Sequence, residues 1–255
     1  MVKIKYLIFL IFLLSNTLFA EPKKIYFYTT EANVNDFKSL KVTFEQYLSQ
    51  YGNYDFQPFN KKEIFEQFLE KQDIIVILSS WHYQQIAKKY NLEAKLVALK
   101  KESITDTKII VGKKGLQFDG TITTTYSKQY SKKLIETLIE NNNLNILNVP
   151  KEIDALMSVG FGLSKFALVS KDSFELLKNV NSFLAKQMTI YKESKPNFRM
   201  IIASKLKNQY SEECINLFKS MNSDVYGKKI LNLLGIDDIV ILTNNDYNKI
   251  IRGVK

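Results

Sequence analysis

Short apolar runs alternate along the chain with stretches in which apolar residues recur every three or four positions. The runs predict β-strands, and the spaced stretches predict amphipathic helices. The run 73–79 is almost continuously apolar, which is typical of a strand buried on both faces of a parallel sheet. This alternation of strands and helices predicts an α/β fold. In the first hundred residues we expect strands at 24–29, 54–59, 73–79 and 94–99 and helices at 36–51, 61–71 and 80–91.

The same alternation continues in the rest of the chain with shorter elements. We expect strands at 107–112, 121–123, 144–149, 165–169, 188–193, 198–204 and 239–243, and helices at 126–140, 151–159, 172–178, 211–221 and 224–234. No flexible linker divides the chain, so two lobes would have to be connected through strands, near 101–107 and 193–198. Residues 21–104 and 196–255 would then form one lobe, and residues 105–195 the other.

The first twenty residues have the three parts of a secretory signal peptide. A basic head with Lys3 and Lys5 precedes the apolar run 6–14, and Ala20 provides a small residue before a polar boundary. The apolar run is too short to cross a bilayer core of about 30 Å as a helix. We therefore expect cleavage after Ala20 and export to the periplasm. A retained N-terminal anchor is the alternative, because Leu18 is larger than the preferred cleavage site accepts.

The formal net charge is +10, and loss of Lys3 and Lys5 with the signal leaves +8. This balance favours small anions or anionic surfaces as partners, whereas nucleic acid is not expected for an exported protein. The lysines are spread along the chain, so most of them are expected to form a solvated surface. A single cysteine excludes an intrachain disulfide.

Sequence motifs of enzymes are absent from the chain. One His and one Cys exclude a Cys/His metal cluster, and no Walker loop or Gly-x-Gly-x-x-Gly is present. A Ser–His–Asp hydrolase using His82 is formally possible, but no Gly-x-Ser-x-Gly elbow accompanies it. We expect a protein that is not an enzyme and that needs no cofactor and no metal. A lone histidine such as His82 is more often structural than a ligand.

One group of candidate binding residues follows predicted strands of the first lobe. Ser79, Ser80 and Trp81 leave a buried strand at its carboxyl end, where open α/β sheets bind ligands. Trp81 would form an aromatic wall beside two hydroxyls. The alternative is that Trp81 packs under its helix while Ser79 or Ser80 caps it. Tyr28 and Thr29 follow the first strand at the same edge.

A second group lies in the middle of the chain. Thr124, Thr125, Tyr126 and Ser127 surround a predicted helix start, where unpaired N–H groups and the helix dipole attract anions. Hydroxyl donors at this position predict an oxyanion site, and the alternative is that they only cap the helix. Ser164 lies in a loop that either faces the cleft or forms a plain turn with its glycines.

The C-terminal region resembles a known family. Residues 227–236 read GKKILNLLGI and are followed by Asp246 and Tyr247. With the signal and the α/β order, this is similar to the phosphate/phosphite/phosphonate-type substrate-binding proteins of ABC importers, in which a helix ending G-x-x-I-L-x-x-L-G-I precedes a strand and a D-Y pair. The resemblance implies a two-lobe, type II periplasmic-binding-protein-like fold with a central ligand cleft. It places Ser79–Tyr83 and Thr123–Ser127 at that cleft, although the family's Ser-Thr-Ser-Gly loop is replaced here.

The resemblance also implies a function. We expect a periplasmic solute-binding protein that captures a small oxyanion, such as phosphonate, phosphate or phosphite, and delivers it to an ABC permease. An exported sensor or accessory protein of the same fold, partnered by a membrane sensor and acting without a transporter, is the alternative. A monomer is the default state for this family.

Overall fold

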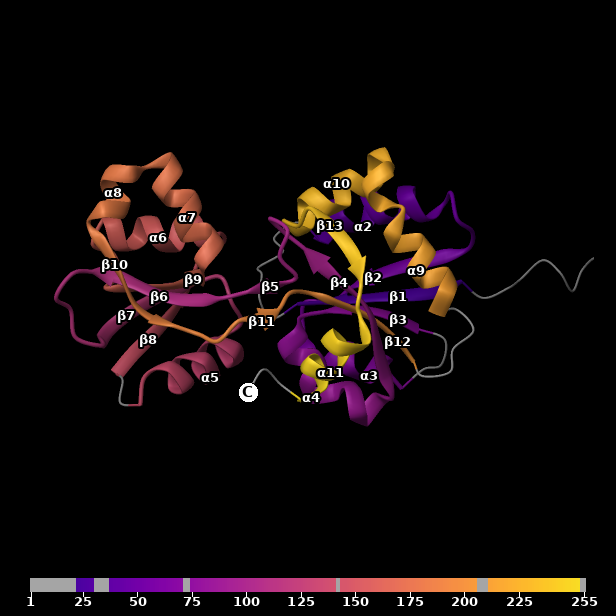
Figure 1. Cartoon of the computed structure of the whole chain (residues 1–255), viewed down its shortest axis with the longest axis horizontal. Coiled ribbons are helices and arrows are strands. Elements are labelled where there is room, and N and C mark those ends of the chain that lie inside the picture. Colours follow the sequence, from indigo (N-terminus) through magenta and orange to yellow (C-terminus); the bar gives the residue numbers. More distant parts are fainter. Residues whose placement is uncertain (1–21, 30–36, 71–73, 141–142, 206–210, 253–255) are drawn as a thin grey trace, which may run out of the picture.

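The structure is a computed structural model that describes residues 22–29, 37–70, 74–140, 143–205 and 211–252. The expected signal peptide at 1–20 lies outside the described residues. Figure 1 shows two α/β lobes side by side, each built on its own sheet and joined by a narrow connection. No helix in the described ranges has both the length and the apolar character needed to cross a membrane.

Lobe 1 is built on a six-stranded sheet with the strand order β13-β4-β12-β3-β1-β2. β1, β2 and β3 are parallel, and β12 and β13 run antiparallel to their neighbours. Its elements are β1 (Lys23–Tyr28), α2 (Phe37–Leu48), β2 (Tyr54–Pro58), α3 (Lys62–Phe68), β3 (Ile74–Leu78), α4 (Ser80–Tyr90), β4 (Leu92–Leu99), β12 (Ile201–Lys205), α9 (Ser211–Lys219), η1 (Met221–Ser223), α10 (Val225–Leu234), β13 (Asp238–Ile241) and α11 (Asn244–Arg252).

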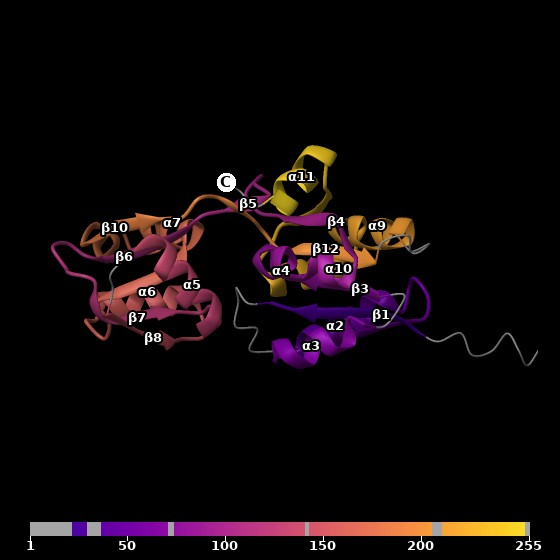
Figure 2. The ribbon, with the colours of Figure 1, turned by 90° about the horizontal axis from the view of Figure 1, so that it is seen from below.

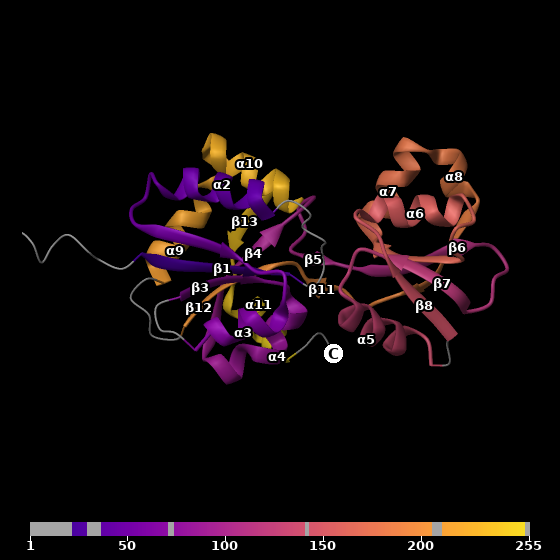
Figure 3. The same cartoon turned by 180° about the vertical axis from the view of Figure 1, so that it is seen from behind.

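Lobe 2 is built on a five-stranded sheet with the order β10-β6-β9-β7-β8. β7 is parallel to β8 and β9, whereas β6 is antiparallel to β9 and β10. Its elements are β6 (Lys108–Lys113), β7 (Asp119–Thr124), α5 (Lys128–Leu138), β8 (Asn143–Asn148), α6 (Glu152–Gly160), β9 (Phe166–Ser170), α7 (Lys171–Val180), α8 (Ser182–Lys186) and β10 (Met188–Glu193). Figure 3 shows α5 on one face of this sheet and α6, α7 and α8 on the other.

The chain passes between the lobes through two short strands, β5 (Thr105–Asp106) and β11 (Asn197–Phe198), which pair antiparallel. Figure 2 shows β5 between the lobes, where the chain leaves β4 for β6. A two-stranded connection of this kind allows two lobes to rotate against each other by small backbone changes.

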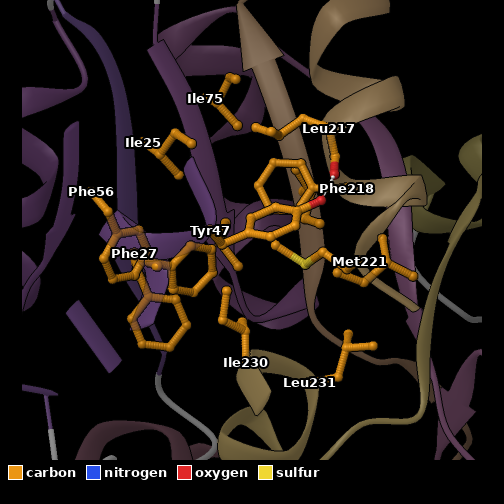
Figure 4. Close-up of a cluster of buried hydrophobic side chains, with 14 of the residues drawn as sticks. Ile25, Phe27, Tyr47, Phe56, Ile75, Leu217, Phe218, Met221, Ile230 and Leu231 are labelled. Carbon is orange, nitrogen blue, oxygen red and sulfur yellow. Dashed lines mark hydrogen bonds between the residues drawn. The ribbon is translucent and has the colours of Figure 1, made fainter. Parts of the chain in front are cut away.

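Each lobe has an apolar layer on both faces of its sheet. In lobe 1, one layer packs under α2, α9 and α10, and Figure 4 shows Tyr47 of α2 beside Phe218 and Met221. Phe44 of α2 stacks on Phe56 of β2, with ring centroids 3.9 Å apart. The Tyr47 hydroxyl donates to the backbone oxygen of Leu217, so this buried polar group is satisfied. These layers explain why the apolar spacing of the sequence predicted the lobe 1 helices.

The C-terminal pattern at 227–236 has a structural reason. Asp224 caps α10 by accepting from the backbone N–H of Gly227 at 2.8 Å. Gly227 lies against the backbone of Met221 so closely that a Cβ atom would collide with it. Gly235 ends the helix with φ +68°, a left-handed conformation that glycine adopts without strain. The motif is therefore a packing signature of lobe 1.

The structure adds elements that the sequence did not predict. The strand expected at 198–204 is divided into β11 and β12, and α8 and α11 were not expected. β5 lies within the range 101–107, where a strand connection between the lobes was expected. β5 and β11 have two residues each and α8 has five, so they are too short for a periodic pattern. α11 was missed because its apolar residues are few among polar ones.

Candidate ligand site between the lobes

The carboxyl ends of parallel strands in both lobes are directed toward the junction. Figures 1 and 3 show β1 running toward the junction from the N-terminal side of lobe 1, and β7 approaching it from the far end of lobe 2. β3 is parallel to β1, and β8 and β9 are parallel to β7, so their carboxyl ends share these edges. Ligands of open α/β sheets bind at such edges. The junction is therefore the candidate site.

One aromatic contact joins the two lobes at this place. Trp81 in the first turn of α4 meets Tyr130 in the first turn of α5 with ring centroids 5.1 Å apart and an interplanar angle of 63°. Tyr130 in turn lies edge-on to Tyr126, at 5.6 Å. Trp81 is half-buried and packs on the lobe 2 apolar layer that contains both tyrosines. The structure thus brings Trp81 and the residues around Thr124 to the same junction.

The contact brings the starts of α4 and α5 together. Neither helix has an acidic residue in its first turn. The positive ends of both helix dipoles are therefore not balanced by a carboxylate of the helix itself. Ser79 is the N-cap residue of α4 but makes no side-chain cap bond. Ser127 caps α5 by accepting from the backbone N–H of Tyr130 at 3.4 Å. Two helix N-termini meeting in this way favour an anion between them.

The hydroxyl groups predicted to bind ligand are largely used within the protein. Ser80 is fully buried and donates to the backbone oxygen of Phe198, which ties α4 to β11. Thr124 is also fully buried, and its hydroxyl accepts from the backbone N–H of Tyr126 at 3.2 Å. Thr125 is 6% exposed and Thr29 is half-buried. Ser127 therefore has the capping role that the sequence left open as an alternative, whereas Thr124 closes a local turn just before the helix.

Tyr28 and His82 form an aromatic group at the lobe 1 edge. The Tyr28 ring stacks on Phe65 at 5.4 Å and lies edge-on to His82 at 5.4 Å. His82 is fully buried, and its Nε2 lies 2.9 Å from Oε1 of Glu66, while Nδ1 has no partner among the described residues. Burial lowers the pKa of His82, although the hydrogen bond to Glu66 opposes this effect. We interpret His82 as a neutral structural residue.

Tyr126 is held inside lobe 2 by a carboxylate that the sequence analysis missed. The ring is fully buried, and its hydroxyl donates to Oε1 of Glu152, the first residue of α6. Glu152 also accepts from the backbone N–H of Ser170 at 2.8 Å, from the Ser170 hydroxyl at 2.5 Å and from the Ser173 hydroxyl. Burial raises the pKa of the Tyr126 phenol well above its ordinary value. In this conformation Tyr126 anchors the lobe 2 edge and has no surface for a ligand.

Buried charges accompany the connecting strands. Lys108 at the start of β6 forms an ion pair of 2.6 Å with Asp106 of β5, and both side chains are 10% exposed. Its ammonium also lies 4.8 Å from the centroid of the Tyr126 ring. Burial alone would raise the pKa of Asp106, but the charge and hydrogen bond of Lys108 hold that pKa below its ordinary value. Lys108 is an exception to the expectation of solvated lysines.

A second ion pair links the end of β11 to lobe 2. Arg199 binds Asp172 of α7 through Nη2 and Oδ2 at 2.8 Å and donates from Nε to the backbone oxygen of Ser103 at 3.0 Å. One signal in the sequence marks this region. Ser170 and Asp172 follow a buried strand at its carboxyl end, as Ser79 and Ser80 do in lobe 1.

The placement of Ser164 in the cleft is corrected by the structure. Ser164 precedes β9, and β9 is parallel to β7, so Ser164 lies at the amino edge of the sheet. The five residues of β9 separate that edge from Ser170 by about 13 Å. The Ser164 hydroxyl lies 3.1 Å from that of Thr123, inside lobe 2. Ser164 is therefore left out of the candidate site.

The described residues offer no group of three or more His, Cys, Asp or Glu side chains that could hold a metal ion. What the junction offers instead is helix N-termini, aromatic rings and paired charges. Such groups can bind and orient a small molecule.

Neither the protein-family models nor the curated protein sequences contain a match to this chain. Solved structures do match. A binding-protein component of a phosphonate ABC transporter from Pseudomonas aeruginosa is 13% identical with a TM-score of 0.59, covering 89% of this chain and 84% of that one. PhnD1 from Prochlorococcus marinus in complex with methylphosphonate is 10% identical with a TM-score of 0.61, covering 92% and 99%.

A Xanthomonas citri protein bound to ATP is 9% identical with a TM-score of 0.62, covering 91% of this chain and 97% of that one. Sequence identities this low support a similarity of fold and no statement about ligand or function. The resemblance inferred from the C-terminal pattern is confirmed at that level: the chain has the two-lobe α/β fold of periplasmic solute-binding proteins.

Proposed function

We propose that this protein is an exported, periplasmic solute-binding protein that captures a small oxyanion between its lobes and delivers it to an ABC permease. Phosphonate, phosphate and phosphite are the proposed ligand class. In this proposal residues 21–104 and 196–255 act as one lobe and residues 105–195 as the other, with β5 and β11 as the hinge. It acts without a cofactor and is not an enzyme.

The observation that carries the proposal is the meeting of α4 and α5 across the junction. The Trp81–Tyr130 contact brings together two helix N-termini that have no acidic residue in their first turns. An oxyanion between them would accept hydrogen bonds from backbone N–H groups of both lobes and so favour the closed arrangement. Exclusion of water from the closed junction would strengthen those hydrogen bonds.

The phosphonate part of the ligand class is supported by two of the structural neighbours. One is a component of a phosphonate transporter, and another was solved with methylphosphonate. A third neighbour was solved with bound ATP, which also carries phosphate groups. Tetrahedral phosphorus oxyanions are common to the ligands of these three proteins, and we extend that chemistry to this chain.

One feature favours the second candidate, an exported sensor or accessory protein. The start of α7 lies on the same edge of lobe 2 as that of α5, and the carboxylate of Glu152 already accepts its N–H and hydroxyl donors. An internal carboxylate at this place reduces the number of donors left for a ligand anion. A site altered in this way suits a protein that has lost transport of the original ligand.

The experiment is a thermal-shift screen of the protein beginning at Glu21 against phosphate, phosphite, methylphosphonate, aminoethylphosphonate, sulfate and neutral solutes. A ligand at 100 times its dissociation constant stabilises the native state by about 2.7 kcal/mol. Saturable stabilisation by one of the phosphorus oxyanions supports the proposal and identifies the ligand. Stabilisation by neutral solutes alone would refute the ligand class, and no response at all would favour the sensor or accessory protein.

A further inference from the structure

The edge strand β8 of lobe 2 differs from the other edge strands of the two sheets. β2 ends in Pro58, β10 has a register shift between Ile190 and Lys192, and β13 has only four residues. Prolines, irregularities and short length are the devices that protect an edge from pairing with another chain. β8 has six residues, pairs with β7 in continuous register and contains no proline and no charge. Its outer edge is therefore unprotected.

An open groove runs along this edge between β8 and α5. It has a volume of about 840 Å³, and apolar side chains, among them Ile135, Leu144 and Ile146, form part of its lining. Leu147 points to the opposite face of the sheet, because successive strand residues alternate, and it is 51% exposed. Both faces of the edge strand thus have apolar surface that the described part of the chain leaves uncovered.

The wall of the groove has an ordered row of charges. Lys128, Lys132 and Glu136 follow each other at intervals of four residues on α5, and Glu140 lies two residues beyond the end of the helix. All four line the groove and are exposed. The order runs against the helix dipole, which favours acidic residues at the start of a helix and basic residues at its end. α5 has neither an acidic first turn nor a basic last turn. Within the helix Lys132 lies 3.9 Å from Glu136, and an exposed pair of this kind contributes only about 0.2–0.5 kcal/mol. The helix itself therefore gains little from this order of charges.

We propose that β8 and α5 form an interface with a second copy of this chain, in place of the expected monomer. A two-fold axis perpendicular to the sheet would pair β8 antiparallel with the β8 of the partner. The two α5 helices would then lie antiparallel on the same face, at a spacing of about 10 Å. In this arrangement Lys128 faces Glu140 of the partner subunit and Lys132 faces Glu136 of the partner subunit. A row of two positive and two negative charges is complementary to its own reversed copy.

The proposal does not depend on the ligand or on the proposed function, and it is tested on the purified protein without ligand. Molar mass is measured by light scattering and sedimentation over a concentration series. By symmetry, Lys132→Glu creates two like-charge contacts in the dimer, and Glu136→Lys does the same. Each single variant is expected to raise the dimer dissociation constant about tenfold or more. The double variant K132E/E136K restores the complementarity and is expected to dimerise like the wild type.

A mixture of the two single variants provides the sharpest outcome. The Lys132→Glu variant has three acidic residues along the groove, and the Glu136→Lys variant has three basic ones. In a mixed dimer these residues face each other, so the mixture is expected to form dimers that neither variant forms alone. Leu147→Lys is expected to weaken the dimer as well, and Val225→Lys, at a residue 79% exposed in lobe 1, is the matched control that leaves it unchanged. Circular dichroism checks that each variant is folded. A wild type that is monomeric at every concentration, or single variants that dimerise as the wild type does, would overturn the proposal.

Discussion

Replacing Tyr130 with leucine removes the ring that lobe 2 places against Trp81. The contact joins the lobes at a centroid distance of 5.1 Å, in the edge-on geometry that aromatic pairs prefer. Such a pair contributes about 0.5–1.5 kcal/mol beyond its buried area. Because 1 kcal/mol corresponds to a factor of about five in an equilibrium, the ratio of closed to open molecules should fall about fivefold in this variant.

The chain contains a single tryptophan, so its fluorescence reports on Trp81 alone. We expect the emission of Tyr130→Leu to shift to longer wavelength and to be quenched more strongly by iodide, because Trp81 loses the ring that covers it. Tyr226→Leu, at an exposed tyrosine of α10 in lobe 1, is the control and should leave the emission unchanged. Unaltered quenching in Tyr130→Leu, with the fold intact, would refute the idea that this contact holds the lobes together.

Three further predictions concern buried polar groups, each checked by urea unfolding. Burial lowers the pKa of His82, so the unfolded chain binds this proton more readily than the folded protein does. The free energy of unfolding should therefore fall as the pH drops through about 6.5, and it should fall less in His82→Gln. An equal fall in both proteins would exclude His82 as the cause. Breaking the ion pair by Asp106→Asn should cost about 3–5 kcal/mol, and adding Lys108→Met should recover part of it; no recovery would contradict the pairing. Glu152→Ala should destabilise more than Tyr126→Phe, because each buried donor left unpaired costs about 1–3 kcal/mol; the reverse order would contradict the network.

The regular elements were predictable because their apolar layers impose a period on the sequence. β3 is buried along its whole length, and the corresponding sequence is almost continuously apolar. The start of α10 was predictable from Asp224, and its end from Gly235. Strand connections between the lobes were expected near 101–107 and 193–198, but the pairing of β5 with β11 was not predictable. Two residues carry no period, and this pairing joins positions about ninety residues apart.

The candidate site was predictable only where the sequence marks the end of a strand. Trp81 and the hydroxyl run before α5 follow buried strands, and the structure brings these two regions together at the junction. Glu152 and Lys108 were missed because long-range contacts give them their roles, and a charged residue at a helix start or a strand start looks solvated in sequence. Ser164 was misplaced because it precedes β9, whereas the hydroxyl run before α5 follows β7. These two strands are parallel, so the two loops lie at opposite edges of the sheet.

Calorimetric titration of two Trp81 variants with methylphosphonate and phosphate tests the central claim most directly. Trp81→Gln and Trp81→Glu both lose the aromatic contact and differ only by a negative charge in the first turn of α4, where a carboxylate also suits the helix dipole. If an oxyanion binds between α4 and α5, Trp81→Glu should bind it about tenfold or more weakly than Trp81→Gln. Equal affinities in the two variants would contradict an anion site at this junction.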